Sequence, residues 1–152
     1  MTTSSSPAQF VARFERAWTA RTTAALATLL HPDVRLVQPL SRPLLGRDAA
    51  LRSLERFIAL TPNMRITLHR WSADGALLFI EFSFHGSVGR RAIQLNIVDR
   101  IELLDGLVRD RTSYFNPAPL VRALLAQPWL LWGLTKRTLV SPATRQGGHP
   151  SS

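Results

Sequence analysis

Cysteine is missing from all 152 residues of this sequence, so disulfides, thiol nucleophiles and thiolate metal sites are excluded. The four histidines stand far apart, at His31, His69, His85 and His149, without the short spacing of metal ligands. We therefore predict no metal site. Acidic residues are also few: ten against nineteen basic residues, which leaves a net charge of +9.

The positive charge comes from eighteen arginines and a single lysine. Such a balance can indicate nucleic acid or an anionic membrane as a partner. Here, however, the arginines are spread along the whole chain without clustering between aromatic residues, and no nucleic-acid-binding motif is visible. We expect no nucleic-acid partner, and we attribute the preference for arginine over lysine to genomic base composition.

The length fits a single domain that can bury a core of its own. Residues 1–7 are polar and contain no apolar signal region, so we expect a disordered tail there and a cytoplasmic location. Residues 8–117 carry the regular apolar patterns of a folded domain. Residues 141–152 are predicted to form a second disordered tail.

A change of period divides the domain into a helical part and a strand part. Three segments have apolar residues every three or four positions, as on one face of a helix: 8–18, 22–30 and 49–60. Five segments are predicted strands: 33–39, 64–73, 77–85, 90–104 and 107–115. Asp74-Gly75 and Asp105-Gly106 are hairpin signals between the longer strands. Helices first and strands afterwards predict an α+β fold, with three N-terminal helices packed on a curved antiparallel sheet.

A further apolar helix is predicted over 118–140. Its uncharged run between Arg122 and Lys136 has 13 residues, whereas a helix needs about 20 to span a bilayer. Three roles are open: the helix could close a pocket, pack in a dimer, or lie on a membrane surface with Lys136 and Arg137 at the headgroups. We favour packing, because apolar helices usually belong to a core.

Asp99 stands out within the strand over 90–104. Side chains alternate between the two faces of a strand, and every odd-numbered position from Ile93 to Leu103 except Asp99 is apolar. Asp99 should therefore face the buried side, where the loss of water would raise its pKa and keep it protonated near neutral pH. A protonated carboxyl group can donate a hydrogen bond to a carbonyl or oxyanion. The alternative is a structural salt bridge with Arg111 or Arg109.

The register of the last hairpin decides which residues Asp99 meets. If Asp105-Gly106 is a two-residue loop, Asp99 shares a face with Tyr114. With a glycine bulge, it shares a face with Arg111 and Ser113 instead. A slip of one residue changes every neighbour, so the residues alone leave both registers open.

Two short sequence motifs accompany this order of predicted helices and strands. LGRDAA at 45–50 opens a helix after the strand that ends in Gln38-Pro39, and LDGLV at 104–108 is followed by SYFN at 113–116. With them, residues 8–117 resemble the nuclear-transport-factor-2-like superfamily, which includes SnoaL-like polyketide cyclases, ketosteroid isomerase and limonene-epoxide hydrolase. The resemblance favours the bulged register. It implies a cone-shaped cavity between helices and sheet, and a homodimer through the other face of the sheet.

The resemblance also places the residues of the known reactions. Asp99 matches the aspartic acid on the oxyanion side of ketosteroid isomerase. The general base of that enzyme falls at Gln38, which cannot take a proton, and its oxyanion-hole tyrosine falls at Phe14, which cannot donate one. Glu81 matches the first catalytic aspartate of limonene-epoxide hydrolase, whose second aspartate falls at Ser113. We therefore expect neither known mechanism.

We predict a pocket for a small apolar or carbonyl-bearing molecule, bound without a cofactor. The expected walls are large apolar side chains, and the expected contacts are a few polar ones: Phe14, Trp18, Phe57, Phe79 and Ile97, with Gln38, Glu81, Asp99 and Ser113. One hypothesis is a binding module without chemistry. The other is a cofactor-independent isomerase, cyclase or hydrolase with Glu81 and Asp99 as an acid–base pair. For Glu81 the alternative is a structural bond to His69 or Arg70.

Overall fold

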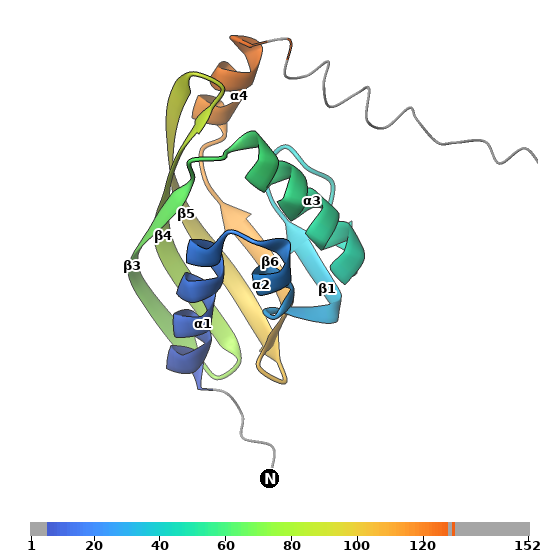
Figure 1. Cartoon of the computed structure of the whole chain (residues 1–152). Coiled ribbons are helices and arrows are strands. Elements are labelled where there is room, and N and C mark those ends of the chain that lie inside the picture. The colour runs from blue at the N-terminus through green and yellow to red at the C-terminus, as the bar shows by residue number, and fades with distance from the viewer. Residues whose placement is uncertain (1–5, 128, 130–152) are drawn as a thin grey trace, which may run out of the picture.

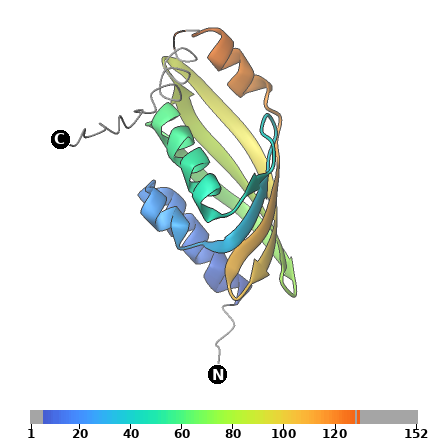
Figure 2. The same ribbon diagram turned by 90° about the vertical axis from the view of Figure 1, so that its right-hand side faces the viewer.

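A curved sheet and three helices on one of its faces form the two layers of the fold (Figures 1 and 2). The computed structural model describes residues 6–127 and 129. The helices on the sheet are α1 (Pro7–Ala20), α2 (Thr23–Ala27) and α3 (Arg47–Leu60). The strands are β1 (Leu30–Val37), β2 (Leu44–Leu45), β3 (Arg65–Asp74), β4 (Leu77–Val88), β5 (Arg91–Leu104) and β6 (Leu107–Tyr114). The predicted α+β class with three N-terminal helices is confirmed.

The strands are ordered β2-β1-β6-β5-β4-β3 across the sheet. β3 to β6 form the expected antiparallel meander, but β1 pairs with β6 in parallel, so the sheet is mixed and not antiparallel throughout. The hairpin signals in the sequence concern only strands that follow one another. β1 and β6 are joined through α3 and the four other strands, and a parallel pair requires a long connection of this kind.

The first helix begins earlier than its apolar pattern indicated. Ser6 caps α1: its hydroxyl accepts a hydrogen bond from the Gln9 N–H, while the Gln9 side chain accepts one from the Ser6 N–H. Ser6 and Pro7 therefore belong to the start of the helix rather than to the predicted tail, and residues 1–5 lie outside the described part. The predicted apolar stripe of α1, which includes Phe10 and Trp18, is buried.

α4 (Ala118–Leu125) lies beside the turn between β4 and β5 (Figure 1). The side chain of Gln127, just after the helix, fixes this position. Its Nε2 donates to the main-chain oxygen of Val88 at 2.5 Å, and its Oε1 accepts from the Arg90 N–H at 3.3 Å. The end of α4 is thereby attached to the β4–β5 turn.

The predicted C-terminal helix over 118–140 is broken within its described part, because α4 ends at Leu125. The residues that precede a proline are disfavoured in a helix, and Pro128 follows closely. The rest of that helix and the predicted tail over 141–152 lie outside the described residues. Within the described ranges, no helix has the length and apolar character needed to cross a membrane.

The β5–β6 hairpin combines features of both registers that the sequence left open. Its turn is the two-residue loop Asp105-Gly106, with positive φ angles of 53° and 74°, as in a type I′ turn. A bulge then follows at Arg109, which is an extra residue on β6. The bulge shifts β6 by one residue and places Ser113 opposite Asp99. The register expected from a glycine bulge is therefore present, but an arginine supplies it.

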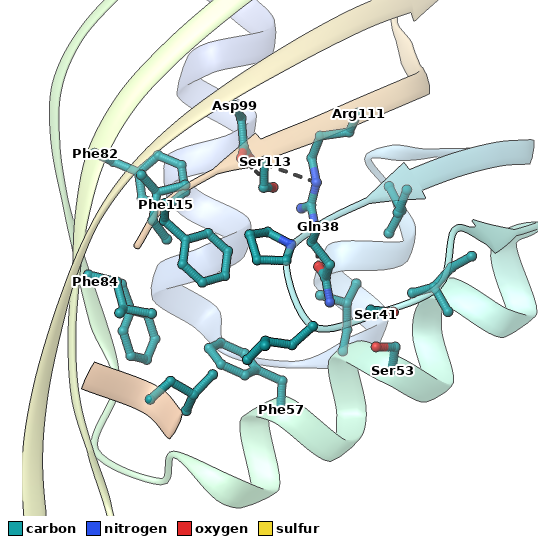
Figure 3. A pocket seen from close by; sticks show the side chains of 18 of the residues that line it. Gln38, Ser41, Ser53, Phe57, Phe82, Phe84, Asp99, Arg111, Ser113 and Phe115 are labelled. Carbon is teal, nitrogen blue, oxygen red and sulfur yellow. Dashed lines mark hydrogen bonds and ion pairs between the residues drawn. The ribbon is translucent and has the colours of Figure 1, made fainter. Parts of the chain in front are cut away.

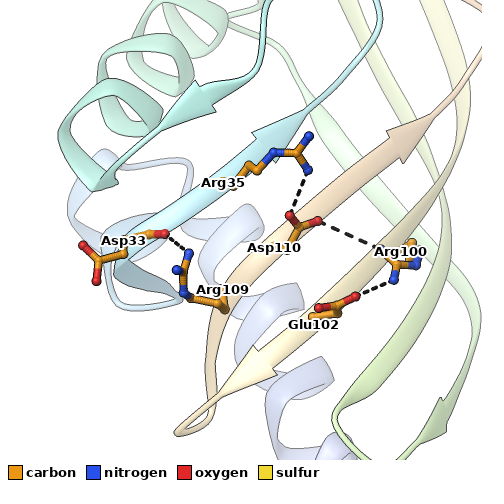
Figure 4. Close-up of polar contacts among 6 residues, drawn as sticks. All are labelled: Asp33, Arg35, Arg100, Glu102, Arg109 and Asp110. Carbon is orange, nitrogen blue, oxygen red and sulfur yellow. Dashed lines mark hydrogen bonds and ion pairs between the residues drawn. The ribbon is translucent and has the colours of Figure 1, made fainter.

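Arg109 and the charged side chains near it lie on the outer face of the sheet, away from the helices (Figure 4). Arg109 donates a hydrogen bond to the main-chain oxygen of Asp33 on β1. Next to it, Asp110 pairs with Arg35 at 3.0 Å. The alternative in which Arg109 forms a salt bridge with Asp99 is therefore wrong, because the two side chains are on opposite faces of the sheet.

Candidate ligand-binding cavity

A cavity of about 250 Å³ lies between the sheet, α1, α3 and α4 (Figure 3). Its walls are mainly aromatic and aliphatic, and these residues include Trp18, Leu36, Leu54, Phe57, Ile66, Phe82, Phe84, Leu95, Ile97, Phe115, Leu120 and Leu124. Four polar lining residues form one connected group, which we call the polar cluster: Asp99, Ser113, Arg111 and Gln38. Asp99 contacts both Ser113 and Arg111, and Arg111 contacts Gln38 in turn. Ser41 and Ser53 complete the polar lining.

Six of the nine predicted site residues line this cavity: Trp18, Gln38, Phe57, Ile97, Asp99 and Ser113. Strand alternation explains Asp99 and Ile97, which lie two residues apart on the inner face of β5. The role of all six residues in ligand binding stays a prediction. The other three, Phe14, Phe79 and Glu81, lie elsewhere.

Asp99 is buried, with 1% of its surface exposed. Ser113 on β6 donates its hydroxyl hydrogen bond to Oδ1 of Asp99 at 2.5 Å. The guanidinium of Arg111 lies close by, with Nε 3.8 Å from Oδ2. Burial raises the pKa of Asp99, while the charge of Arg111 and the bond from Ser113 oppose that rise less strongly. When it is protonated, this carboxyl group can donate a hydrogen bond.

Arg111 is the part of the site that was not among the predicted residues. Only 9% of its surface is exposed, and its Nη2 donates to Oε1 of Gln38 at 3.3 Å. Its Nε is buried and makes no hydrogen bond with the described residues. The bulged register could have identified Arg111 as a site residue, because that register places Arg111 on the same face of β6 as Ser113, two residues before it.

Glu81 does not lie in the cavity, so the prediction that it does is wrong. It is the neighbour of Val98 in the β4–β5 pairing, whereas Asp99 is opposite Ile80. Consecutive strand residues point to opposite faces, so Glu81 is on the outer face. There it pairs with Arg70, and the pair lowers the pKa of Glu81. The alternative bond to Arg70 is confirmed, and an acid–base pair of Glu81 and Asp99 cannot form.

Phe79 and Phe14 also lie outside the cavity. Phe79 precedes Glu81 by two residues on the same outer face, and 39% of its surface is exposed. Phe14 is buried between α1 and the sheet, where its ring centroid is 5.5 Å from that of Phe82. Phe14 contributes to a small crevice beside Trp18 instead of to the cavity wall.

The chemistry available in the cavity is limited. Among the described residues that line it, Asp99 and Arg111 are the only ionisable ones. Asp99 can give a proton or a hydrogen bond, and Arg111 can supply a positive charge, but this described lining holds no second carboxylate or histidine to act as a base. Within residues 6–127 and 129, no three histidine, aspartate or glutamate side chains gather as metal ligands would.

Solved structures with the same fold include proteins of different descriptions. A hypothetical protein from Catenulispora acidiphila with a ketosteroid isomerase-like fold, in complex with trimethylamine, has a TM-score of 0.69 at 18% identity, over 76% of this chain and 91% of that one. A putative SnoaL-like polyketide cyclase from a Jannaschia species has a TM-score of 0.67 at 14% identity, over 78% and 94%. An epoxide hydrolase from M. tuberculosis, similar to limonene-epoxide hydrolase, has 0.64 at 20% identity, over 83% and 94%.

At these identities the structural likeness shows the fold alone. No curated protein matches the sequence. The model of one protein family, described as the SnoaL-like domain, matches residues 11–111, from α1 to Arg111 in the polar cluster. By its sequence and its fold, this chain belongs to the SnoaL-like domain family.

Proposed function

We propose that this protein binds a small, mostly apolar molecule in the cavity, with one polar end of the molecule directed at the polar cluster. One observation carries the proposal: the walls are apolar, and the connected polar groups lie on one side. Ligand pockets usually combine apolar walls with a few polar groups that orient the ligand. The trimethylamine complex of the Catenulispora acidiphila protein supports a role of this kind.

The cavity volume limits the size of this molecule. An apolar cavity of about 150 Å³ already holds benzene. The present cavity, at about 250 Å³, therefore has room for one substituted ring or an open chain of similar size. A molecule with several fused rings would require α4 to move, because Leu120 and Leu124 close one side.

The proposal is tested with a library of fluorinated one-ring fragments that carry carbonyl, hydroxyl or carboxyl groups. Binding is followed by the broadening of their ¹⁹F NMR signals. Ser53→Trp places a large side chain at the cavity, whereas Ala59→Trp makes the same kind of change on the exposed side of α3. Fragments should bind the wild type and the Ala59→Trp variant, and Ser53→Trp should abolish binding. If no fragment binds the wild type, or if Ser53→Trp binds equally well, the proposal is wrong.

A second candidate function is catalysis without a cofactor, in which Asp99 donates a proton or hydrogen bond to a carbonyl oxygen. The burial of Asp99 and its raised pKa favour this role. Such a reaction also removes a proton from the carbon next to the carbonyl. Because Gln38 cannot act as a base, water would have to accept that proton. The test is the exchange of the hydrogens next to the carbonyl of 2-cyclohexenone in deuterated water, measured by NMR. Exchange no faster than in buffer, or equally fast with Asp99→Asn, would exclude this candidate for such ketones.

We also propose that the chain forms a homodimer through the outer face of the sheet. Apolar side chains are exposed on neighbouring strands there: 39% for Phe79, 38% for Val98 and 56% for Tyr114. Val98 is directly opposite Tyr114, and Phe79 is diagonal to Val98, because Phe79 itself pairs with Arg100 and Glu81, two residues on, is opposite Val98. Light scattering after size-exclusion chromatography should give the mass of a dimer for the wild type and that of a monomer for Val98→Arg. A monomeric wild type would contradict this proposal.

A further inference from the structure

Among the described residues that line the cavity, one carries a fixed positive charge and one can supply a negative charge. Asp99 faces Ile80 on β4 and both Ser113 and Arg111 on β6. The helices add only uncharged side chains to the lining: Trp18 from α1, Ser53, Leu54 and Phe57 from α3, and Leu120 and Leu124 from α4. Within the described part of the chain, the charge in the cavity is therefore set by Arg111 and Asp99, together with the charge of any bound ligand.

The contact between these two residues is not a saturated ion pair. Nε of Arg111 lies 3.8 Å from Oδ2 of Asp99, beyond hydrogen-bond distance, while Oδ1 of Asp99 already accepts from Ser113. Nη2 of Arg111 has the neutral Oε1 of Gln38 as its partner, at 3.3 Å. The buried Nε–H is left without an acceptor among the described residues. A buried guanidinium with an unused donor leaves one place for an acceptor to fill.

An acceptor on the ligand can satisfy Arg111 better than Asp99 does. A carboxylate offers two oxygens that match the fork of a guanidinium and form short, charge-assisted hydrogen bonds. With such a group in place, a second negative charge on Asp99 would be repelled in the same buried space. Asp99 would then be protonated and donate its hydrogen bond instead of accepting one.

Resting on the function proposed above, we propose that the ligand is a monoanion, a carboxylate on an apolar body of about one ring, with the carboxylate on Arg111 and a proton on Asp99. Either Asp99 or the ligand supplies the single negative charge next to the guanidinium. Where Asp99 is ionised in the free protein, binding takes up one proton from the solvent. Affinity for the anion then falls by up to tenfold for each unit of pH, and it does not rise with pH in any range.

The test compares 4-fluorobenzoate with 4-fluorobenzamide, which has nearly the same shape and no charge. Dissociation constants are measured by ¹⁹F NMR titration of the wild type between pH 5.5 and 8. We expect the benzoate to bind at least tenfold more tightly than the benzamide at pH 5.5. This comparison requires no variant, so it is decisive even if a substitution in the cavity prevents folding.

Variants then assign the preference to individual residues. Arg111→Gln should remove the preference for the anion, whereas Arg109→Gln, on the outer face of the same strand, should preserve it. Asp99→Asn keeps an uncharged group of the same shape, so it should bind 4-fluorobenzoate at least as tightly as the wild type at pH 8. Far-ultraviolet circular dichroism and urea unfolding confirm that each variant is folded.

The outcomes separate this inference from the proposed function. If the benzamide binds, Ser53→Trp blocks it and the benzoate shows no preference, then only the inference is overturned. A loss of benzoate binding in Asp99→Asn would also overturn it, because an ionised Asp99 would then be needed to hold Arg111. If neither probe nor any library fragment binds the wild type, both the function and the inference are wrong.

Discussion

Replacing Asp99 by asparagine should change how the stability of this protein depends on pH. Asparagine has the same shape, and its Oδ1 can still accept the hydrogen bond that Ser113 donates at 2.5 Å. It cannot ionise, however. Any effect of the new amide on Arg111 is the same at every pH, so it shifts the free energy of unfolding by a constant and leaves the slope unaffected.

The sign follows from burial. The pKa of Asp99 is raised in the folded protein, chiefly by desolvation. The wild type therefore has its full stability below the unfolded pKa of about 3.9, and it loses stability as the pH rises from there to the folded pKa. Within that window the loss is about 1.4 kcal/mol for each pH unit. The unfolding free energy of Asp99→Asn should therefore rise, relative to that of the wild type, by about 1.4 kcal/mol for each pH unit in this window. The difference should level off above the folded pKa.

The assay is urea unfolding of both proteins from pH 3.5 to 8, with the difference in unfolding free energy plotted against pH. Other titrating groups cancel in this difference, provided that the two proteins share the same slope with urea. The pH at which the curve levels off gives the folded pKa directly. The reasoning would be refuted if this difference did not change with pH, or if Asp99→Asn became less stable relative to the wild type as the pH rises. Either result would show that the charge of Arg111 outweighs desolvation in setting the pKa of Asp99.

Three other substitutions test the description of the fold. Glu81→Gln removes the exposed pair with Arg70, and because such pairs contribute little, both the urea midpoint and fragment binding should be unchanged; a loss of binding would place Glu81 in the site after all. Gly89→Ala would bring a Cβ within 1.5 Å of Oε1 of Gln127 at a φ of +58°, so we expect a loss of about 1–2 kcal/mol or more and faster amide hydrogen exchange in α4, and unchanged exchange would contradict the attachment. Phe84→Ala removes a ring that is 1% exposed, and urea unfolding should show a loss of about 3–5 kcal/mol; a much smaller loss would mean that the cavity collapses around it.

The sequence predicted best where one face of a strand differs clearly from the other. On β5, the odd-numbered neighbours of Asp99 are apolar and the even-numbered ones largely polar, so its burial followed from alternation alone. The positions of the hairpins were equally clear, because Asp-Gly pairs are typical of tight turns. Asp105-Gly106 is itself the loop of its hairpin, whereas Asp74 ends β3 and the loop there is Gly75-Ala76, with a positive φ at Gly75.

The face of β4 was harder to assign. Its run from Leu77 to Phe84 is almost continuously apolar, so Glu81 could be assigned to either face. The even positions alone are uniformly apolar, and this weaker signal would have placed Glu81 and Phe79 outside. Phe79 hid the signal, because a large aromatic residue on the outer face looks like part of the core.

Arg111 and the parallel pairing of β1 with β6 depend on contacts between distant parts of the chain. Gln38 and Arg111 are 73 positions apart and meet only because β1 lies beside β6. A pattern of period two identifies a strand and its faces, but it carries no information on which strand lies next to it. The direction of that pair and the composition of the polar cluster therefore required the structure.

The single additional residue in the last hairpin also suggests how such a cavity could acquire a different chemistry. If Arg109 were deleted, the strand beyond it would turn over, and Thr112 and Tyr114 would point inward in place of Arg111 and Ser113. A cation and a small alcohol would be exchanged for an alcohol and a phenol, and of the apolar wall residues only Phe115, on the same stretch of chain, would be affected. A change in length at an exposed bulge of β6, rather than substitutions inside the cavity, would then be enough to alter what the protein recognises.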